Sequence, residues 1–180
     1  MIRLFVGIGL PETLSERLTG LRGQIPGARW VPPENHHITL RFVGEVDEEV
    51  AGDLDLALAR IDAPPFELAL HGVGHFESRG LVRSLWAGVE PDQALDHLHA
   101  KIESAGQRVG LEPEGRKFHP HVTLARCRDT RTARIAGFLA DHGGFGAPAF
   151  PVGSFALYSS TLGRGGALYS REVDYPLGRP

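Results

Sequence analysis

The sequence predicts an α+β protein with two pseudo-symmetric lobes, each a small antiparallel sheet backed by helices, and a central cleft between them. Two observations lead to this prediction. Short β-rich segments alternate with segments whose apolar residues recur at helical spacing. Similar segments also recur, in the same order, in both halves of the chain. Because 180 residues suffice for one buried core, we expect a single domain over residues 1–180, built by duplication of about 1–80 and 81–180.

The duplication is visible as matches at spaced positions. IRLFVGIGLPETLSERL at 2–18 resembles VRSLWAGVEPDQALDHL at 82–98, with an offset of 80 residues. Farther along, His37 matches His121 at an offset of 84, so an insertion of four residues separates the two sets of matches. Any one match could arise by chance, but the shared order across both halves indicates an internal repeat.

The first half begins with an apolar, β-rich segment at 2–9, which predicts a strand. Pro11 suits the first turn of the following helix, because proline lacks the N–H that this turn leaves unbonded. The other elements expected in this half are the rest of that helix, with Leu14, Leu18 and Leu21 on its apolar face, a strand at 36–43, a helix carrying Val50, Leu54, Leu58 and Ile61, and a strand at 66–70.

The second half repeats this order, and two further strands come after it. Stretches rich in Gly and Pro at 23–33, 110–115 and 143–151 predict connections, and His71 and His75 lie in a Gly-rich segment that we expect to form a turn. The elements expected in this half are a strand at 81–89, a helix at 91–106, a strand at 119–126, a helix at 130–141 and strands near 150–158 and 167–174.

The tetrapeptide pattern His-x-Thr-Leu occurs once in each half. Side chains alternate between the faces of a strand, so His37 and Thr39 share one face, and His121 and Thr123 share the equivalent one. If the duplication creates a pseudo-twofold axis, both polar faces line one cleft. A single His-x-Thr is typical of an ordinary half-exposed strand, but two copies at matching places indicate a functional site.

Two imidazoles and two hydroxyls around one centre suit acid–base chemistry at phosphorus. An unperturbed histidine titrates near pH ~6.5, so one ring can accept a proton while the other donates one. Threonine hydroxyls donate well to anionic oxygens. We therefore expect His37 and His121 to catalyse an in-line displacement at phosphorus without a metal or another cofactor, with Thr39 and Thr123 binding the substrate.

Composition limits the partners and the compartment. A formal net charge of −3 argues against broad electrostatic binding of nucleic acid, so a nucleotide would have to be bound locally. Cys127 is the only cysteine, which excludes an internal disulfide and fits a reducing cytoplasm. The N-terminus lacks the features of a signal peptide, and the apolar runs are too short to span a membrane. We expect a cytoplasmic monomer that does not contact a membrane.

The stretches WVPPENHHITLRFVGEV at 30–46, FHPHVTLAR at 118–126 and FALYSSTLGRGGALYSREVDYPL at the end carry a family resemblance. With LFVGI near the start and FELALHGVGHF, they resemble the two-histidine phosphoesterases, and most closely the bacterial 2′–5′ RNA ligase or RNA 2′,3′-cyclic phosphodiesterase branch. The resemblance extends over essentially the whole chain. His36 departs from it, because the family usually has an apolar residue there.

This resemblance implies hydrolysis of a ribose 2′,3′-cyclic phosphate, on an RNA end or a nucleotide, to a 2′-phosphate. Some members also join RNA ends weakly through a 2′–5′ bond without ATP. Carried over, His37 is the general acid for the leaving 3′-oxygen and His121 is the general base for the attacking water. Thr39 and Thr123 hold the non-bridging oxygens.

Phe42 and Arg126 each lie five residues after a motif histidine. Equal offsets in a duplicated fold predict equivalent places that face across the same cleft, where a flat ring and a flat cation could stack on one nucleobase. The family pattern also has Phe and Arg at these places. Strict alternation would instead point Arg41 into the cleft, so this prediction requires each strand to end or bulge after its motif. The alternatives are that Phe42 is core and Arg126 a surface charge, or that Arg126 contacts the phosphate.

Two other classes of protein stay open. The pairs His97/His99 and His119/His121 have the His-x-His spacing of a metallohydrolase, although no carboxylate or cysteine set completes a recognisable metal site. A non-catalytic nucleotide-binding module could also retain the cleft, although both copies of the motif are intact. Metal analysis tests the first alternative, and a turnover assay tests the second.

Overall fold

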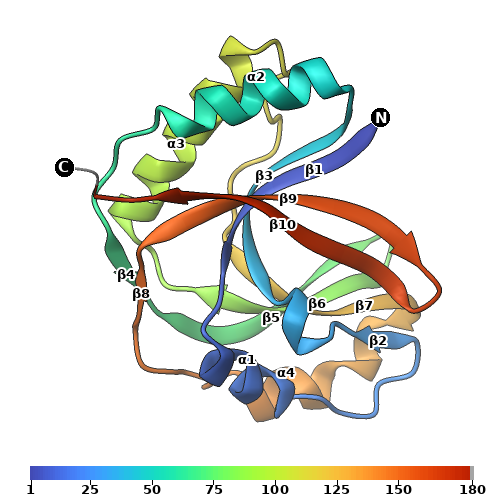
Figure 1. Ribbon diagram of the computed structural model, residues 1–180. Helices are drawn as coiled ribbons and strands as arrows, with labels where there is room; N and C mark the ends of the chain where they lie inside the picture. Colours follow the sequence, from blue (N-terminus) through green and yellow to red (C-terminus); the bar gives the residue numbers. More distant parts are fainter. Residues whose placement is uncertain (179–180) are drawn as a thin grey trace.

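The computed structural model describes residues 1–178, in which strands and helices alternate along the chain (Figure 1). The helices are α1 (Glu12–Thr19), α2 (Glu48–Ala59), α3 (Gln93–Arg108) and α4 (Ala136–His142), with short 3₁₀ turns at Pro33–Asn35 and Thr132–Arg134. The strands are β1 (Ile2–Gly9), β2 (Ala28–Trp30), β3 (His37–Val46), β4 (Phe66–Leu68), β5 (Leu70–Ser78), β6 (Leu81–Val89), β7 (His121–Arg131), β8 (Phe150–Val152), β9 (Ser154–Gly163) and β10 (Gly166–Pro176).

Two antiparallel half-sheets meet at the centre of the molecule. The strand order is β10-β9-β1-β3-β7-β6-β5, with β2 along the edge of β7, and β4 pairs separately with β8. The half-sheets join through one residue pair, Ile38 of β3 with Val122 of β7. Both residues are the middle residue of a His-x-Thr motif. The predicted α+β class with two antiparallel lobes is confirmed, and the lobes are continuous through the two motif strands.

Each lobe contains strands from both halves of the sequence. β5, from the end of the first half, pairs with β6, and β9, from the end of the second half, pairs with β1. The helices are grouped in the same way, since α2 and α3 lie together over one lobe while α1 and α4 lie together beside the other (Figure 1). We propose that this reciprocal exchange reflects the internal duplication, which would make the two halves parts of one domain.

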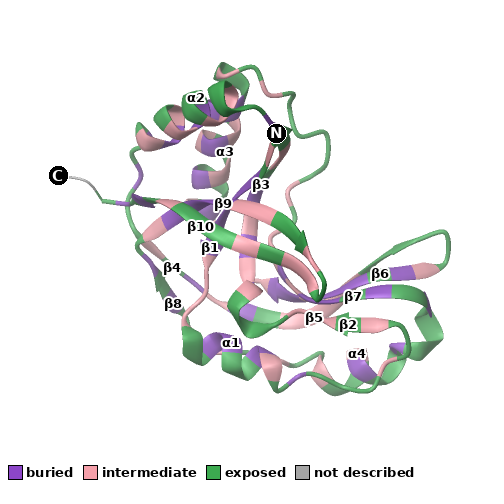
Figure 2. Cartoon of the chain, turned by 45° about the vertical axis from the view of Figure 1, so that its right-hand side comes forward, coloured by how far each residue is buried: buried purple, intermediate pink, exposed green. Residues whose placement is uncertain are grey.

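The apolar positions of the motifs form the core side of the central strands. Ile38 and Val122 are fully buried, and Leu40 and Leu124 are nearly so. Buried residues shown in Figure 2 continue from these strands under the helices of each lobe. The motif histidines and threonines are only half-buried and lie on the other face. None of the helices within residues 1–178 is both long and apolar enough to cross a membrane.

Several boundaries differ from the sequence-based prediction. The helix expected at 130–141 begins only at Ala136, because β7 continues to Arg131 and the hydroxyl of buried Thr130 donates to the carbonyl of Pro26. The predicted turn around His71 and His75 is instead part of β5, which pairs with β6. The predicted strand at 66–70 divides between β4 and β5, and β2 lies within the stretch expected to be a connection.

Candidate active site

The two His-x-Thr motifs come together where β3 and β7 pair. Because the strands are antiparallel at Ile38 and Val122, His37 lies toward Thr123, and Thr39 lies toward His121. All four polar side chains therefore gather on the face opposite the buried pair. The structure thus brings together the four motif residues that the sequence singled out.

Each motif histidine is oriented by the main chain two residues before it. The Nδ1–H of His37 donates to the carbonyl of Asn35 at 2.7 Å, and the Nδ1–H of His121 donates to the carbonyl of His119 at 2.6 Å. The 3₁₀ turn at Pro33–Asn35 presents the first carbonyl, and the amide of Asn35 donates to the carbonyl of Ala167 in β10 at 2.9 Å. Nδ1 is occupied in both rings, so Nε2 is the nitrogen available for proton transfer.

A local hydrogen bond distinguishes His37 from His121. The Nε2 atom of His37 lies 2.9 Å from the Thr39 hydroxyl. With Nδ1 protonated, the hydroxyl donates to Nε2 in the neutral ring. In the protonated ring, Nε2–H donates to the hydroxyl instead. A substrate oxygen that takes this proton would displace Thr39, whose hydroxyl is then free to donate to a phosphate oxygen.

The pKa values of both motif histidines are lowered. For His37 the main cause is burial, with further contributions from the positive charges of Arg126 and His121. For His121 the main cause is again burial, followed by the charges of His119 and Arg126. The main-chain hydrogen bonds act in the opposite direction in both rings. Arg126 is therefore a positive charge that lowers the pKa of both rings.

Aromatic rings enclose each histidine. The ring centroid of Phe5 lies 4.7 Å from that of His37, and Tyr169 meets His37 edge-on at 5.3 Å. On the other side, Phe76 meets His121 edge-on at 4.9 Å. These apolar neighbours bury the rings and thus supply the main cause of their lowered pKa values.

Matching bulges occur after the two motifs. In β3 the pairing with β1 shifts between Thr39 and Arg41, and in β7 the pairing with β6 shifts between Thr123 and Ala125. Each bulge adds one residue, so two successive residues after each Thr are buried and the next is exposed. The exposed residues are Phe42 and Arg126, which consequently lie on the histidine face.

Arg41 turns away from the cleft, contrary to strict alternation. Its side chain is only 6% exposed, and its guanidinium binds the Glu103 carboxylate and the Glu112 carbonyl. Arg41 therefore links β3 to α3 and to the loop after that helix. The bulge condition for Phe42 and Arg126 is met, and Arg41 has a structural role in the core.

Phe42 and Arg126 project from opposite ends of the cleft, which corrects the expectation that they face each other across it. Both lie four residues beyond the central pair of Ile38 and Val122, and the two strands run antiparallel there. At ~3.3 Å per residue, each lies about 13 Å from that pair, in opposite directions. One base cannot contact both. Arg126 lies at the end where His37 begins β3, while the Phe42 ring lies 5.3 Å from the Arg3 guanidinium carbon.

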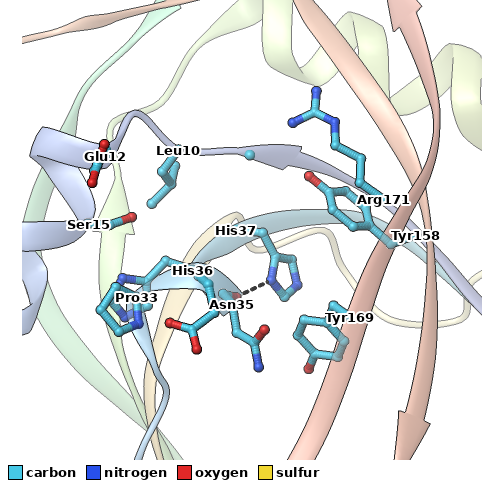
Figure 3. Close-up of a pocket in the computed structure, with 12 residues that line it drawn as sticks. Leu10, Glu12, Ser15, Pro33, Asn35, His36, His37, Tyr158, Tyr169 and Arg171 are labelled. Carbon is cyan, nitrogen blue, oxygen red and sulfur yellow. Dashed lines mark hydrogen bonds between the residues drawn. The ribbon is translucent and has the colours of Figure 1, made fainter.

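A pocket of about 500 Å³ opens beside His37 (Figure 3). Tyr158 and Tyr169 form an aromatic wall on one side, and α1 lies on the other. The sequence carries no signal for this pocket, because the residues that line it come from distant segments without a common spacing. Besides His37 and the tyrosines, its lining comprises Gly9, Leu10, Glu12, Ser15, Pro33, Glu34, Asn35, His36 and Arg171.

The other histidines are placed differently. Burial, and then the charge of Arg22, lowers the pKa of His36 to about 4, and its Nδ1 atom has no hydrogen-bond partner within residues 1–178. His99 stacks on Phe118 at 3.8 Å, and His75 contacts Glu77. Across the described chain, no three His, Cys, Asp or Glu side chains are grouped so as to hold a metal ion.

Comparisons with a family model and with curated proteins point to the same family. The family model described as the 2′-5′ RNA ligase superfamily matches residues 10–164. An RNA 2′,3′-cyclic phosphodiesterase of Aeropyrum pernix is 36% identical over 85% of this chain and 90% of its own length, and that of Escherichia coli is 33% identical over 93% and 92%.

The crystal structure of E. coli LigT in apo form superposes with a TM-score of 0.82 at 32% identity, covering 99% of this chain and 98% of that chain. LigT complexed with 3′-AMP gives a TM-score of 0.81 at 31% identity, covering 99% of both chains.

Proposed function

This chain belongs to the 2′-5′ RNA ligase superfamily, and on that basis we propose that it is an RNA 2′,3′-cyclic phosphodiesterase that converts a ribose 2′,3′-cyclic phosphate end to a 2′-phosphate. The observation that carries the proposal is the pair of half-buried histidines on one face of β3 and β7. Both rings have Nδ1 bonded to the main chain and Nε2 available. Family members that ligate RNA suggest a 2′–5′ ligase side activity, in which the 5′-hydroxyl of a second RNA replaces water as the nucleophile and the 3′-oxygen again leaves.

The proposed mechanism uses each histidine once. His121 Nε2 accepts a proton from water as the water oxygen attacks phosphorus. His37 Nε2 donates a proton to the 3′-oxygen as its bond to phosphorus breaks. Thr39 and Thr123 donate to the non-bridging oxygens. The products are a 3′-hydroxyl and a 2′-phosphomonoester, and the two histidines have exchanged protonation states.

The roles proposed for the two histidines also imply an orientation for the nucleoside. In-line displacement puts the attacking and leaving oxygens on opposite sides of phosphorus. The leaving oxygen belongs to the ribose, so the nucleoside lies on the His37 side. The pocket beside His37 offers tyrosine rings for apolar contact, and Glu12, Glu34 and Ser15 can bind hydroxyl or amino groups. All catalytic groups come from one chain, which supports a monomer; its single cysteine suits the cytoplasm.

The identity of the product end tests the proposal directly. An RNA ending in a 2′,3′-cyclic phosphate is incubated with the protein in EDTA, and we expect complete conversion to a 2′-phosphomonoester. A 3′-phosphate product would contradict the assignment of His37 to the 3′-oxygen. Activity that disappears on chelation and returns with zinc would favour a metallohydrolase instead.

The pH dependence tests the histidine pair. In the catalytically active protonation state, His121 is neutral and His37 is protonated. As the pH increases, kcat/KM should therefore rise through one pKa of the pair and fall through the other. Both pKa values are lowered from about 6.5, so we expect the optimum below about pH 6.5. Removal of a positive charge in Arg126→Gln should raise both values and move the optimum to higher pH. An unshifted optimum would show that Arg126 does not act on the pair.

A further inference from the structure

β2 and β3 lie end to end along one edge of β7. Since β6 occupies the opposite edge of β7, Ala28–Trp30 and Ile38 must share the remaining edge. The 3₁₀ turn at Pro33–Asn35 lies between the two segments. β2 therefore continues the line of β3 beyond His37. This is the side of the phosphorus on which the proposed mechanism places the nucleoside.

Two arginines face each other on this extension. Arg29 of β2 and Arg126 of β7 are direct cross-strand partners, so their side chains share a face. Trp30, the neighbour of Arg29, packs against Phe138 of α4 at a ring distance of 5.9 Å, so Arg29 points to the opposite face. That is also the face of Arg126 and the two motif histidines.

The pair is not neutralised by the protein. Like charges directly opposite each other destabilise a sheet. Both arginines are exposed, and within residues 1–178 neither forms an ion pair with an acidic side chain. Arg29 lies against the start of β10, where a Cβ built on Gly166 would be 3.5 Å from its guanidinium carbon. Ser84, the partner of Arg126 in β6, adds a hydroxyl to the same row.

We propose that Arg29, beside Arg126, binds the phosphodiester immediately 5′ of the reacting nucleotide. This proposal rests on the proposed function, which places the nucleoside on the His37 side of phosphorus. Arg126 lies three residues along β7 from Thr123, which is opposite His37, and Arg29 lies beside Arg126 at ~4.8 Å, on the line that continues β3 beyond His37. Both guanidinium groups are therefore beyond His37, on the side proposed for the nucleoside. The adjacent pocket carries Glu12 and Glu34, which repel phosphate and favour the nucleoside. The preferred substrate is therefore an RNA end, ahead of a cyclic mononucleotide.

The test compares three substrates in two matched variants. They are a nucleoside 2′,3′-cyclic phosphate, a dinucleotide ending in a cyclic phosphate, and that dinucleotide with a neutral methylphosphonate link. In Arg29→Gln, we expect kcat/KM to fall about tenfold more for the dinucleotide than for the mononucleotide, as expected for loss of a charge-assisted hydrogen bond. The neutral link should remove this difference. Arg108→Gln, an equal charge change on exposed α3, should leave the ratio unchanged.

If Arg29→Gln loses the same factor of kcat/KM on the mononucleotide and on the dinucleotide, the proposal is overturned. A binding measurement distinguishes this outcome from failure of the proposed function, because it does not depend on catalysis. If the unmodified protein hydrolyses neither the cyclic mononucleotide nor the dinucleotide ending in a cyclic phosphate, the proposed function is wrong. Fluorescence anisotropy with a labelled dinucleotide ending in a 2′-phosphate then tests Arg29 alone. An affinity about tenfold weaker, with a salt dependence reduced by about one charge, supports the phosphate contact, and unchanged affinity contradicts it.

Discussion

Replacement of either His37 or His121 by Ala should lower kcat by about 10²–10⁴-fold, the usual contribution of one positioned proton transfer. The reason is specific to each ring: one variant loses the acid for the 3′-oxygen, and the other loses the base for water. Because the two rings act in one step, the double variant should lose much less than the product of the two single losses. Single-turnover kinetics on a cyclic-phosphate RNA measure the effect on the chemical step.

The matched control is His97→Ala, an exposed histidine on α3 away from the cleft, which should retain activity. Circular dichroism spectra of all variants at the assay temperature verify that they are folded. A His37→Ala or His121→Ala variant that keeps full activity would exclude the acid–base pair.

Arg41→Met should reduce the free energy of unfolding by about 3–5 kcal/mol, because it leaves the charge of Glu103 without its buried partner. Burial by itself would raise the pKa of Glu103, but the hydrogen bond from Arg41 is among the interactions that hold it below its ordinary value. Urea unfolding at pH 7 measures the loss. The double variant Arg41→Met/Glu103→Leu, which removes both charges, should recover much of the stability.

Arg108→Met is the control for loss of an exposed arginine, and its effect should stay within about 0.5 kcal/mol. At a temperature where the Arg41→Met protein remains folded, its kcat/KM should lie close to that of the unmodified protein, since Arg41 faces away from the histidines. A stable but inactive Arg41→Met protein would instead put Arg41 in the cleft, as strict strand alternation predicts.

Local patterns contained most of the fold. The strand predicted at 2–9 and the one at 81–89 agree with β1 and β6 to the residue. The alternation of polar and apolar residues in His37–Leu40 correctly assigned Ile38 to the core. The helix predicted at 130–141 was misplaced because its first residues complete a strand ladder with β6, and such long-range pairing overrides local preference.

Local residue patterns also predicted part of the functional site. His37, Thr39, His121 and Thr123 are recognisable because a repeated pattern on a strand predicts which side chains share a face. Tyr158 and Tyr169 carry no such signal, since only the β9–β10 hairpin brings them to the pocket beside His37. Their proximity depends on which strands pair, which local residue patterns do not specify.

Residue patterns alone thus specify the class of fold, the two motif strands and their four polar residues. The side-chain directions beyond each motif depend instead on tertiary pairing. A bulge changes the face of every later side chain, so it buries Arg41 and exposes Phe42 and Arg126. The antiparallel pair of Ile38 with Val122 then sends Phe42 and Arg126 to opposite ends of the cleft. Bulge and register are fixed by hydrogen bonds between strands far apart in the chain, and a period of two residues makes a shift of one position reverse the side-chain direction.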